Sequence, residues 1–179
     1  VAALILREGQ ASACAVSSAG STPLHFACKS ENLNAARMFL DAAENLGRTQ
    51  EMLALTPNLG MPQGRYLQGK SALALAVSTS SDDLVEFLLV QKAEVNGASK
   101  RASNGTPLHI AARSCWSDVV IEKLLDAKAD VNAVVPGSGY TPLHYAVQED
   151  YLDSASVIVQ RGGSVNKPKR DGMTPFHLA

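Results

Sequence analysis

The sequence has few cysteines, few aromatic residues and no long apolar run. Its three cysteines, Cys14, Cys28 and Cys115, include no Cys-x-x-Cys pair, which argues against a disulfide-rich scaffold and favours an intracellular setting, cytoplasmic or nuclear. The longest uninterrupted apolar stretches, 1–6 and 72–77, are six residues each. A membrane span needs about 20 apolar residues and the core of a signal peptide about 7 or more. Neither stretch therefore predicts membrane insertion or a secretion signal.

An excess of charge of one sign is also missing. Lys and Arg number 16 against 17 Asp and Glu, which leaves a formal net charge of −1 at pH 7. A chain with this balance has no global positive field, so nucleic acid is not an expected partner. Charged residues make up 18% of the 179 residues and hydrophobic ones 46%. This composition predicts a globular domain with a core rather than a disordered tail or a long coiled coil.

One segment of eight residues recurs along the chain. Its Thr or Ser marker stands at positions 22, 71, 106, 141 and 174, with spacings of 49, 35, 35 and 33 residues. Midway between markers comes a second motif, Val-Asn, which ends at Asn96, Asn132 and Asn166 and follows an apolar helical stretch. Each unit is therefore predicted to run from a turn through two helices to an extended loop. The copies of the first segment are Gly20–Ala27, the degenerate Gly69–Ala76, Asn104–Ala111, Gly139–Ala146 and Gly172–Ala179.

This pattern resembles the ankyrin repeat, whose hallmark is TPLHxAA at a period of 33 residues. The resemblance covers nearly the whole chain and implies an all-α solenoid of about five stacked helix–turn–helix units with projecting β-hairpin-like loops. Because the chain starts and stops inside repeats, we expect it to belong to a longer polypeptide. The resemblance divides 1–179 into the end of a preceding repeat (1–19), a repeat with an insertion at about 41–68 (20–68), three further repeats (69–103, 104–138, 139–171) and the start of another (172–179).

The chemistry of the recurring segment explains its residue types. Thr before the helix can cap free N–H groups, and Pro at the first helical position loses no hydrogen bond. The copy that begins at Ser71 lacks the Pro and has Ala74 in place of His, so we expect this repeat to be the least stable. The asparagines of the second motif are expected to bond the loop backbone.

All four histidines, His25, His109, His144 and His177, occupy the same place in the segment. One imidazole per repeat cannot converge on a single metal ion or substrate. We therefore expect buried imidazoles that bond the adjacent loop backbone, with no catalytic residue, no metal and no cofactor.

A phosphate-loop pattern, GxxxxGK[ST], spans Gly64–Ser71 and offers nucleotide binding as an alternative function. That motif requires a buried strand immediately before it. Turn formers fill 56–63 instead, and Gly69–Ser71 already belongs to the repeat. The repeat interpretation is therefore favoured.

The resemblance implies a non-catalytic protein–protein interaction module, a scaffold or adaptor. Family members bind partners on the concave surface formed by the hairpin tips and the first helices. A permanent structural subunit of a large assembly is the alternative in the same class. Lys100–Arg101 and Lys167–Arg170 are interpreted as basic, solvated hairpins. Candidate contacts for a partner protein or peptide, carried over by position, are Tyr140, Arg113, Met173, Gln148, Glu149, Arg170, Lys100 and Arg101.

Two further regions are candidates for partner contact. Trp116 lies at an inter-helix turn, outside the usual concave set. The insertion carries Leu59, Met61 and Tyr66, which are unusually apolar for a merely tolerated loop. In the competing interpretation, residues 40–55 extend the second helix of their repeat, and the insertion folds back onto that repeat.

Overall fold

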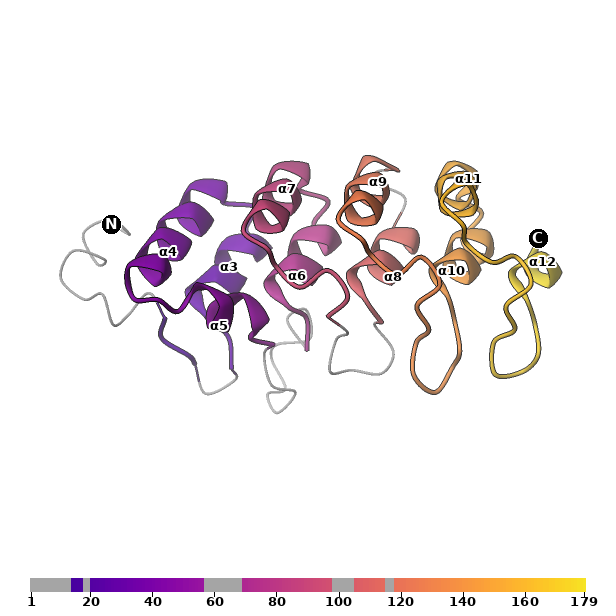
Figure 1. The fold of residues 1–179 in the computed structure, drawn as a ribbon, viewed down its shortest axis with the longest axis horizontal. Helices are drawn as coiled ribbons and strands as arrows, with labels where there is room; N and C mark the ends of the chain where they lie inside the picture. Colours follow the sequence, from indigo (N-terminus) through magenta and orange to yellow (C-terminus); the bar gives the residue numbers. More distant parts are fainter. Residues whose placement is uncertain (1–13, 18–19, 57–68, 98–104, 115–117) are drawn as a thin grey trace. The chain divides into compact units, whose positions relative to one another are not determined.

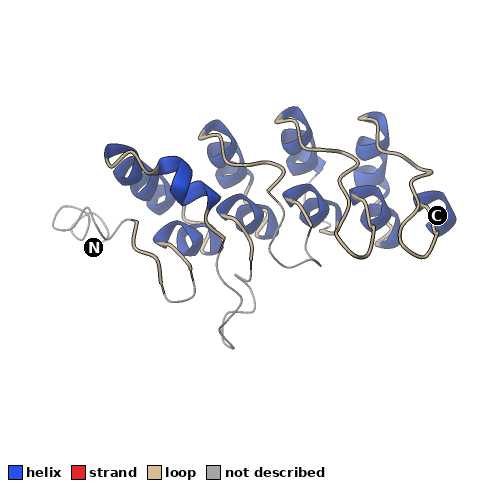
Figure 2. Ribbon diagram, turned by 60° about the horizontal axis from the view of Figure 1, so that its bottom comes forward, coloured by secondary structure: helices blue, strands red, loops and turns tan. Residues whose placement is uncertain are grey.

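The computed structural model describes residues 14–17, 20–56, 69–97, 105–114 and 118–179. Its contacts group the chain into two compact units, Val1–Glu94 and Val95–Ala179. In Figure 2 the described residues form helices joined by loops, and no strand is found among them. The all-α fold class predicted from the repeat pattern is confirmed.

Each unit is built from antiparallel helix pairs, which Figure 1 shows as a layer of first helices beside a layer of second helices. In the first unit α3 pairs with α4, α6 pairs with α7, and α3 also packs on α6. The short α5 packs against both α4 and α6. The bounds are α3 Pro23–Lys29, α4 Leu33–Asn45, α5 Thr49–Ala54, α6 Ala72–Ser78 and α7 Asp82–Val90.

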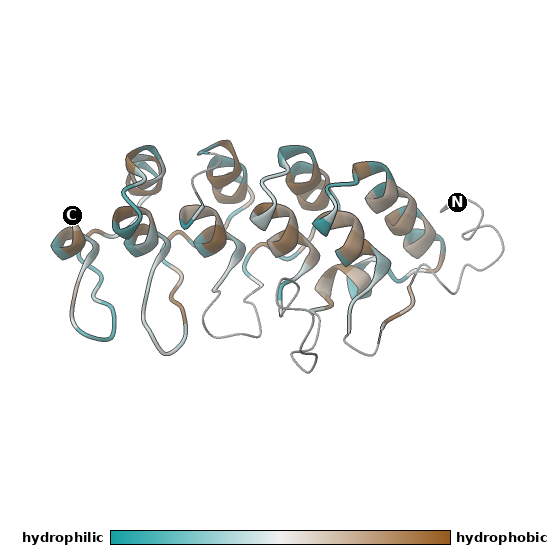
Figure 3. Ribbon diagram, turned by 180° about the vertical axis from the view of Figure 1, so that it is seen from behind, coloured by the Kyte–Doolittle hydropathy of each residue, from teal (hydrophilic) through white to brown (hydrophobic). Residues whose placement is uncertain are grey.

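The second unit repeats the arrangement. Helix α8 pairs with α9 and α10 with α11, while α8, α10 and α12 follow one another in the first-helix layer. The loops before α10 and α12 project beyond this layer, and the loop before α12 is mostly hydrophilic (Figure 3). The bounds are α8 Pro107–Ala112, α9 Asp118–Asp126, α10 Pro142–Gln148, α11 Leu152–Gln160 and α12 Pro175–Leu178.

The projecting loops are closed by paired backbone hydrogen bonds, as the resemblance to hairpins predicts. Val135 N–H donates to the Tyr140 carbonyl at 2.8 Å, and Lys169 N–H donates to the Met173 carbonyl at 2.8 Å. The two loops also touch, since Arg170 N–H donates to the Ser138 carbonyl at 2.9 Å. A Cβ at Gly139 would lie 2.9 Å from that Arg170 nitrogen, so only glycine allows this close approach.

Leucine supplies most of the core of both units. The helices are short, so stability comes from packing between helix pairs rather than from each helix alone. Helix α6, which lacks the Pro and the His of the other copies, buries six of its seven residues. The side chains of largest volume with almost no exposure are Leu24, Leu40, Met52, Leu73, Leu75, Leu84, Leu88, Leu108, Ile121, Leu124, Leu143 and Ile158.

One prediction about the insertion is wrong. Residues 40–55 do not continue the second helix: α4 ends at Asn45 and α5 begins at Thr49. Gly47 turns the chain between them with φ of 65°. The turn allows Met52 and Leu53 to fold back into the core, where they are 1% and 3% exposed. The described part of the insertion therefore packs onto its own unit.

The Val-Asn motifs connect successive repeats within the second unit. Asn132 donates from Nδ2 to the Gly162 carbonyl at 3.0 Å and accepts at Oδ1 from Ser164 N–H at 2.8 Å. Asn96 makes the equivalent pair with the Lys128 carbonyl and the Asp130 N–H. The asparagines thus bond loop backbone, as expected, and the loop is that of the following repeat.

We predict that Asn132→Ala lowers the free energy of unfolding by about 1–2 kcal/mol, because two backbone groups lose their partner. Asn166 is an exposed asparagine at the equivalent position. Asn166→Ala is the matched control and should change stability by less than about 0.5 kcal/mol. Urea unfolding followed by circular dichroism measures both. Equal effects of the two substitutions would contradict the bridging role.

The turn after α11 differs from its counterparts because its backbone bonds a β-branched isoleucine where theirs bonds leucine. Ala93 and Ala129 donate backbone N–H groups to Leu88 and Leu124, whereas Gly163 donates to Ile158. A Cβ at Gly163 would lie 2.6 Å from Ile158 Cγ2 and 2.8 Å from the Ile158 carbonyl oxygen. Alanine is therefore strained here by the Cγ2 of a β-branched neighbour, which the other two turns lack, and by the carbonyl oxygen of the same residue.

We predict that Gly163→Ala destabilises the chain by about 1–3 kcal/mol through overpacking. Adding Ile158→Leu should recover part of this loss, because it removes the Cγ2 contact and leaves the carbonyl contact. The measurement is a double-mutant cycle in urea. Strictly additive effects of the two substitutions would show that the side chain is not the obstacle.

Candidate functional site

Imidazoles connect successive repeats of the second unit. At the start of α8, Thr106 N–H donates to His109 Nδ1 at 3.0 Å, and His109 Nε2 lies 3.2 Å from the Tyr140 carbonyl oxygen. At the start of α10, His144 likewise accepts from Thr141 N–H at 3.1 Å, and its Nε2 lies 3.2 Å from the Met173 carbonyl. Because Nδ1 accepts an N–H, the ring is neutral and Nε2–H donates to the carbonyl.

His25 makes the same connection in the first unit, but to the insertion. Thr22 N–H donates to His25 Nδ1 at 3.2 Å, and Nε2 lies 3.0 Å from the Leu55 carbonyl. The two residues are 30 positions apart, against 31 and 29 for the other two pairs. The first repeat therefore keeps its normal length up to Leu55, and the extra residues of the insertion follow that point.

These three histidines act as structural bridges, as the repeat pattern predicts. His177, by contrast, is exposed and bonds Thr174, so the predicted burial is wrong for the fourth imidazole. Burial lowers the pKa of His25 from 6.5 to about 4, and burial also lowers the pKa of His109 and of His144. Both ring nitrogens of each of these imidazoles are engaged. Among the described residues, no group of three His, Cys, Asp or Glu side chains could hold a metal ion.

Cys28, which occupies the second alanine position of the TPLHxAA motif, is buried and inert. Burial raises the pKa of its thiol to about 12, so the reactive thiolate does not form near neutral pH.

The phosphate-loop pattern has its final serine inside the repeat architecture. Ser71 is 8% exposed, and its Oγ accepts from Ala74 N–H at 3.2 Å as the cap of α6. This hydroxyl would have to hold a magnesium ion in a nucleotide site. Residues 64–68 of the pattern lie outside the described residues.

A group of rings and cations connects α8 and α10 with the loops before α10 and α12 in the second unit. We call Arg113, Tyr140, Tyr145 and Lys169 the tyrosine cluster. The two tyrosine rings are 4.9 Å apart at an interplanar angle of 33°. Arg113 Cζ lies 5.7 Å from the centre of the Tyr145 ring, and Lys169 Nζ lies 5.1 Å from the centre of the Tyr140 ring. The rings therefore pack against each other at a tilt, with one cation near each.

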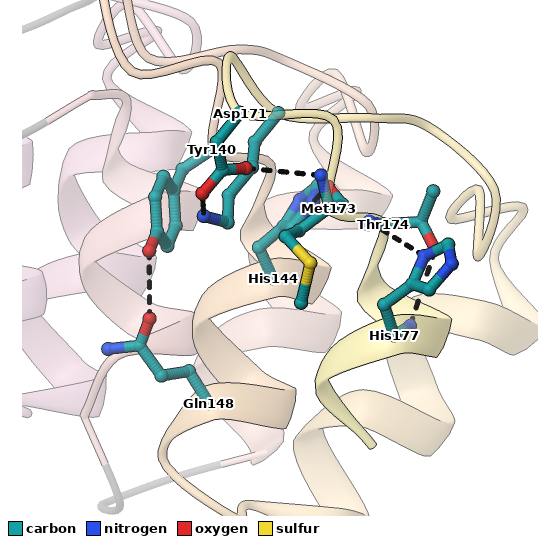
Figure 4. Close-up of polar contacts among 8 residues, drawn as sticks. Tyr140, His144, Gln148, Asp171, Met173, Thr174 and His177 are labelled. Carbon is teal, nitrogen blue, oxygen red and sulfur yellow. Dashed lines mark hydrogen bonds and ion pairs between the residues drawn. The ribbon is translucent and has the colours of Figure 1, made fainter.

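Polar contacts fix the position of Tyr140. Its hydroxyl donates to Gln148 Oε1 at 3.0 Å, and Lys169 pairs with Asp171 (Figure 4). Asp171 in turn accepts from Met173 N–H at 3.1 Å. The Lys169 side chain is only 10% exposed, so the interpretation of this lysine as part of a solvated loop is wrong.

Met173 lies in the loop before α12, where its carbonyl accepts from His144 Nε2–H. The structure brings three of the other predicted contact residues together: Arg113, Tyr140 and Gln148. With Tyr145 they form what we call the hairpin face. Glu149 lies in the turn after α10, and Arg170 lies in the loop before α12, where it donates to the Gly137 carbonyl at 3.3 Å. The other candidates, Lys100, Arg101, Trp116, Leu59, Met61 and Tyr66, lie outside the described residues.

Tyr145 is the residue of the hairpin face that sequence reasoning missed. It occupies the variable position of the repeated segment, where the other copies have Phe26, Leu75, Ile110 and Leu178. The sequence did contain a signal for Tyr145, because its hydroxyl group stands at a position where the other copies have purely apolar side chains.

The comparisons with known proteins agree with this architecture. The family described as "Ankyrin repeats (3 copies)" matches residues 1–98, 42–133 and 73–169. The chain belongs to the ankyrin-repeat family. Ankyrin repeats are in general non-catalytic protein–protein interaction modules. No helix of the described residues is long and apolar enough to cross a membrane.

Three relatives illustrate the similarity. The Neurogenic locus Notch protein of Drosophila melanogaster is 32% identical over 141 residues, which cover 78% of this chain and 5% of that protein. A putative ankyrin repeat protein of fowlpox virus is 30% identical over 129 residues, covering 72% of this chain and 38% of the relative. The mouse B-cell lymphoma 3 protein homolog is 27% identical over 183 residues, which cover 89% of this chain and 41% of that protein. The chain thus spans less than half the length of these relatives.

The buried imidazoles predict a fall in stability below pH 6.5. A lowered pKa means that the unfolded state binds the proton first, so stability is complete above 6.5 and is lost as the pH falls toward 4. His25 alone should remove about 2 kcal/mol between pH 7 and pH 5. Urea unfolding of the wild type across this range tests the slope. His25→Gln should flatten it and the exposed His177→Gln should not; equal slopes would contradict the assignment.

Proposed function

We propose that the chain is a non-catalytic scaffold or adaptor module that binds a partner protein or peptide on the hairpin face of the second unit. The tyrosine cluster is the observation that carries the proposal. Tyr140 and Tyr145 are half-buried and Arg113 is exposed. Tyrosine and arginine are the residue types that most often dominate binding energy at protein interfaces.

The hairpin face is suited to binding because its side chains are already held in place. The Tyr140 hydroxyl bonds Gln148, the Tyr145 ring packs edge-to-face on His109 at 6.0 Å, and both loops are closed by backbone bonds. Little conformational entropy is then lost on association.

The proposal extends to the insertion and to the cellular setting. Leu59, Met61 and Tyr66 remain proposed contacts on their residue types. Their test is removal of 57–68 alone, because a deletion from 41 would also remove the buried Met52 and Leu53 and the carbonyl of Leu55. The proposed setting is intracellular, cytoplasmic or nuclear, which the free thiols of Cys14 and Cys28 support.

Substitutions that the fold already accommodates test the hairpin face. Tyr145→Ile places there the residue of the previous repeat, Ile110, and Tyr140→Met places there the residue of the next one, Met173. Both remove tyrosine while keeping an apolar side chain at each position. The control is Val119→Ser with Arg161→Gln, on the second helices, where both side chains are exposed.

We predict that affinity capture from cell extract, quantified by mass spectrometry, recovers specific proteins with the wild type. The Tyr140→Met/Tyr145→Ile variant should recover at least tenfold less of them, since a pair of central aromatic anchors is lost. The second-helix control should recover wild-type amounts. Loss in the control with retention in the tyrosine variant would place the binding surface on the second helices and overturn the proposal.

A further inference from the structure

The tyrosine cluster has one cation that is neutralised inside the protein and one that is not. Lys169 pairs with Asp171, and its side chain is largely covered. Arg113 is exposed, and none of the ion pairs among the described residues involves it. Its guanidinium group lies over the Tyr145 ring. With Cζ 5.7 Å from the ring centre, the guanidinium keeps its N–H donors available, and its edge can bind a carboxylate with two parallel hydrogen bonds.

Charge in the second unit is divided between its two layers. The second helices and the turns after them carry five acidic and three basic residues, a local excess of negative charge. The first-helix side of the same unit carries four basic residues against three acidic ones, so an acidic partner meets the less negative side at the hairpin face. The residues counted on the second-helix side are Asp118, Glu122, Asp126, Asp130 and Asp153 against Lys123, Lys128 and Arg161, and those on the first-helix side are Arg113, Lys167, Lys169 and Arg170 against Glu149, Asp150 and Asp171.

We propose that the hairpin face selects an extended acidic peptide. One Asp or Glu of the peptide pairs with Arg113, and a neighbouring side chain packs on the ring of Tyr140 or Tyr145. The inference rests on the proposed function and adds the chemistry of the partner. A doubly charged phosphate group generally recruits several Arg or Lys residues, whereas Arg113 is a single free cation at the ring pair.

Glu149 gives the proposal a test of opposite sign. Glu149 is exposed and lies in the turn directly after Gln148. Gln148 and Arg113 occupy equivalent positions in successive repeats. A carboxylate at this place repels an acidic ligand. Glu149→Gln should therefore raise the affinity for an acidic peptide, while Arg113→Gln should lower it.

The experiment selects peptides from a phage-displayed library of random 12-residue sequences on the purified wild-type chain. The selected peptides should contain more Asp and Glu than the unselected library. The strongest binder is then synthesised, together with a form in which its Asp and Glu are amides. Kd values are measured by fluorescence anisotropy for the wild type, Arg113→Gln, Glu149→Gln and the charge-matched control Arg161→Gln.

For the wild type and Arg161→Gln, we expect the amide peptide to bind about tenfold more weakly than the acidic one. For Arg113→Gln this difference should vanish, and Glu149→Gln should bind the acidic peptide two- to fivefold more tightly. The inference is overturned if the amide form loses as much affinity for Arg113→Gln as for the wild type. Melting temperatures of all variants confirm that the comparison is made on folded protein.

The outcomes separate this inference from the proposed function. Selected peptides that lose binding to Tyr140→Met/Tyr145→Ile but contain no excess of acidic residues would overturn the acidic chemistry and leave the hairpin face as the binding site. Selected peptides that bind this variant as tightly as the wild type would overturn both.

Discussion

A neutral imidazole at the start of a first helix holds neighbouring repeats together. Its Nδ1 accepts the N–H of the threonine that begins its own helix, and its Nε2–H reaches a carbonyl in the loop that leads into the next helix pair. One side chain thus satisfies a free N–H at the helix start and fixes the direction in which the chain enters the next repeat. Because both partners are backbone groups, the bridge does not depend on which side chains the loop carries.

That independence separates the fold from the surface used for binding. The carbonyls that receive the imidazoles belong to Tyr140 and Met173, two side chains of different chemistry at one structural position. The asparagine bridges also use backbone groups of the following turn. Side chains on the hairpin face can therefore change without loss of the connections between repeats. The tyrosine cluster is one such variable set of side chains. Its rings and cations contact one another and take no part in the backbone bridges between repeats.

The sequence was sufficient for the parts of the structure that are periodic. The recurring Thr-Pro-Leu-His correctly predicted the helix pairs, the structural role of the buried histidines and the hairpin-like loops. It was not sufficient where a contact joins residues with no periodic relation. Tyr145 was missed because its packing against Tyr140 depends on a loop closing onto a helix. The break between α4 and α5 was missed because the residues on both sides of Gly47 favour a helix. The turn at Gly47 allows Met52 to be buried, and this burial stabilises the turn.

The insertion shows how a repeat protein accepts extra chain. His25 finds its carbonyl at Leu55, at nearly the separation seen in regular repeats, although α5 replaces the usual loop on the way there. The bridge of the first repeat is therefore complete before the additional residues begin. Residues placed between a finished bridge and the next helix cost mainly loop-closure entropy, which grows only slowly with length. An insertion before Leu55 would instead displace the acceptor of His25 and leave a buried imidazole nitrogen unpaired, which costs about 1–3 kcal/mol. The bridge thus determines where in the repeat new sequence can be added at low cost.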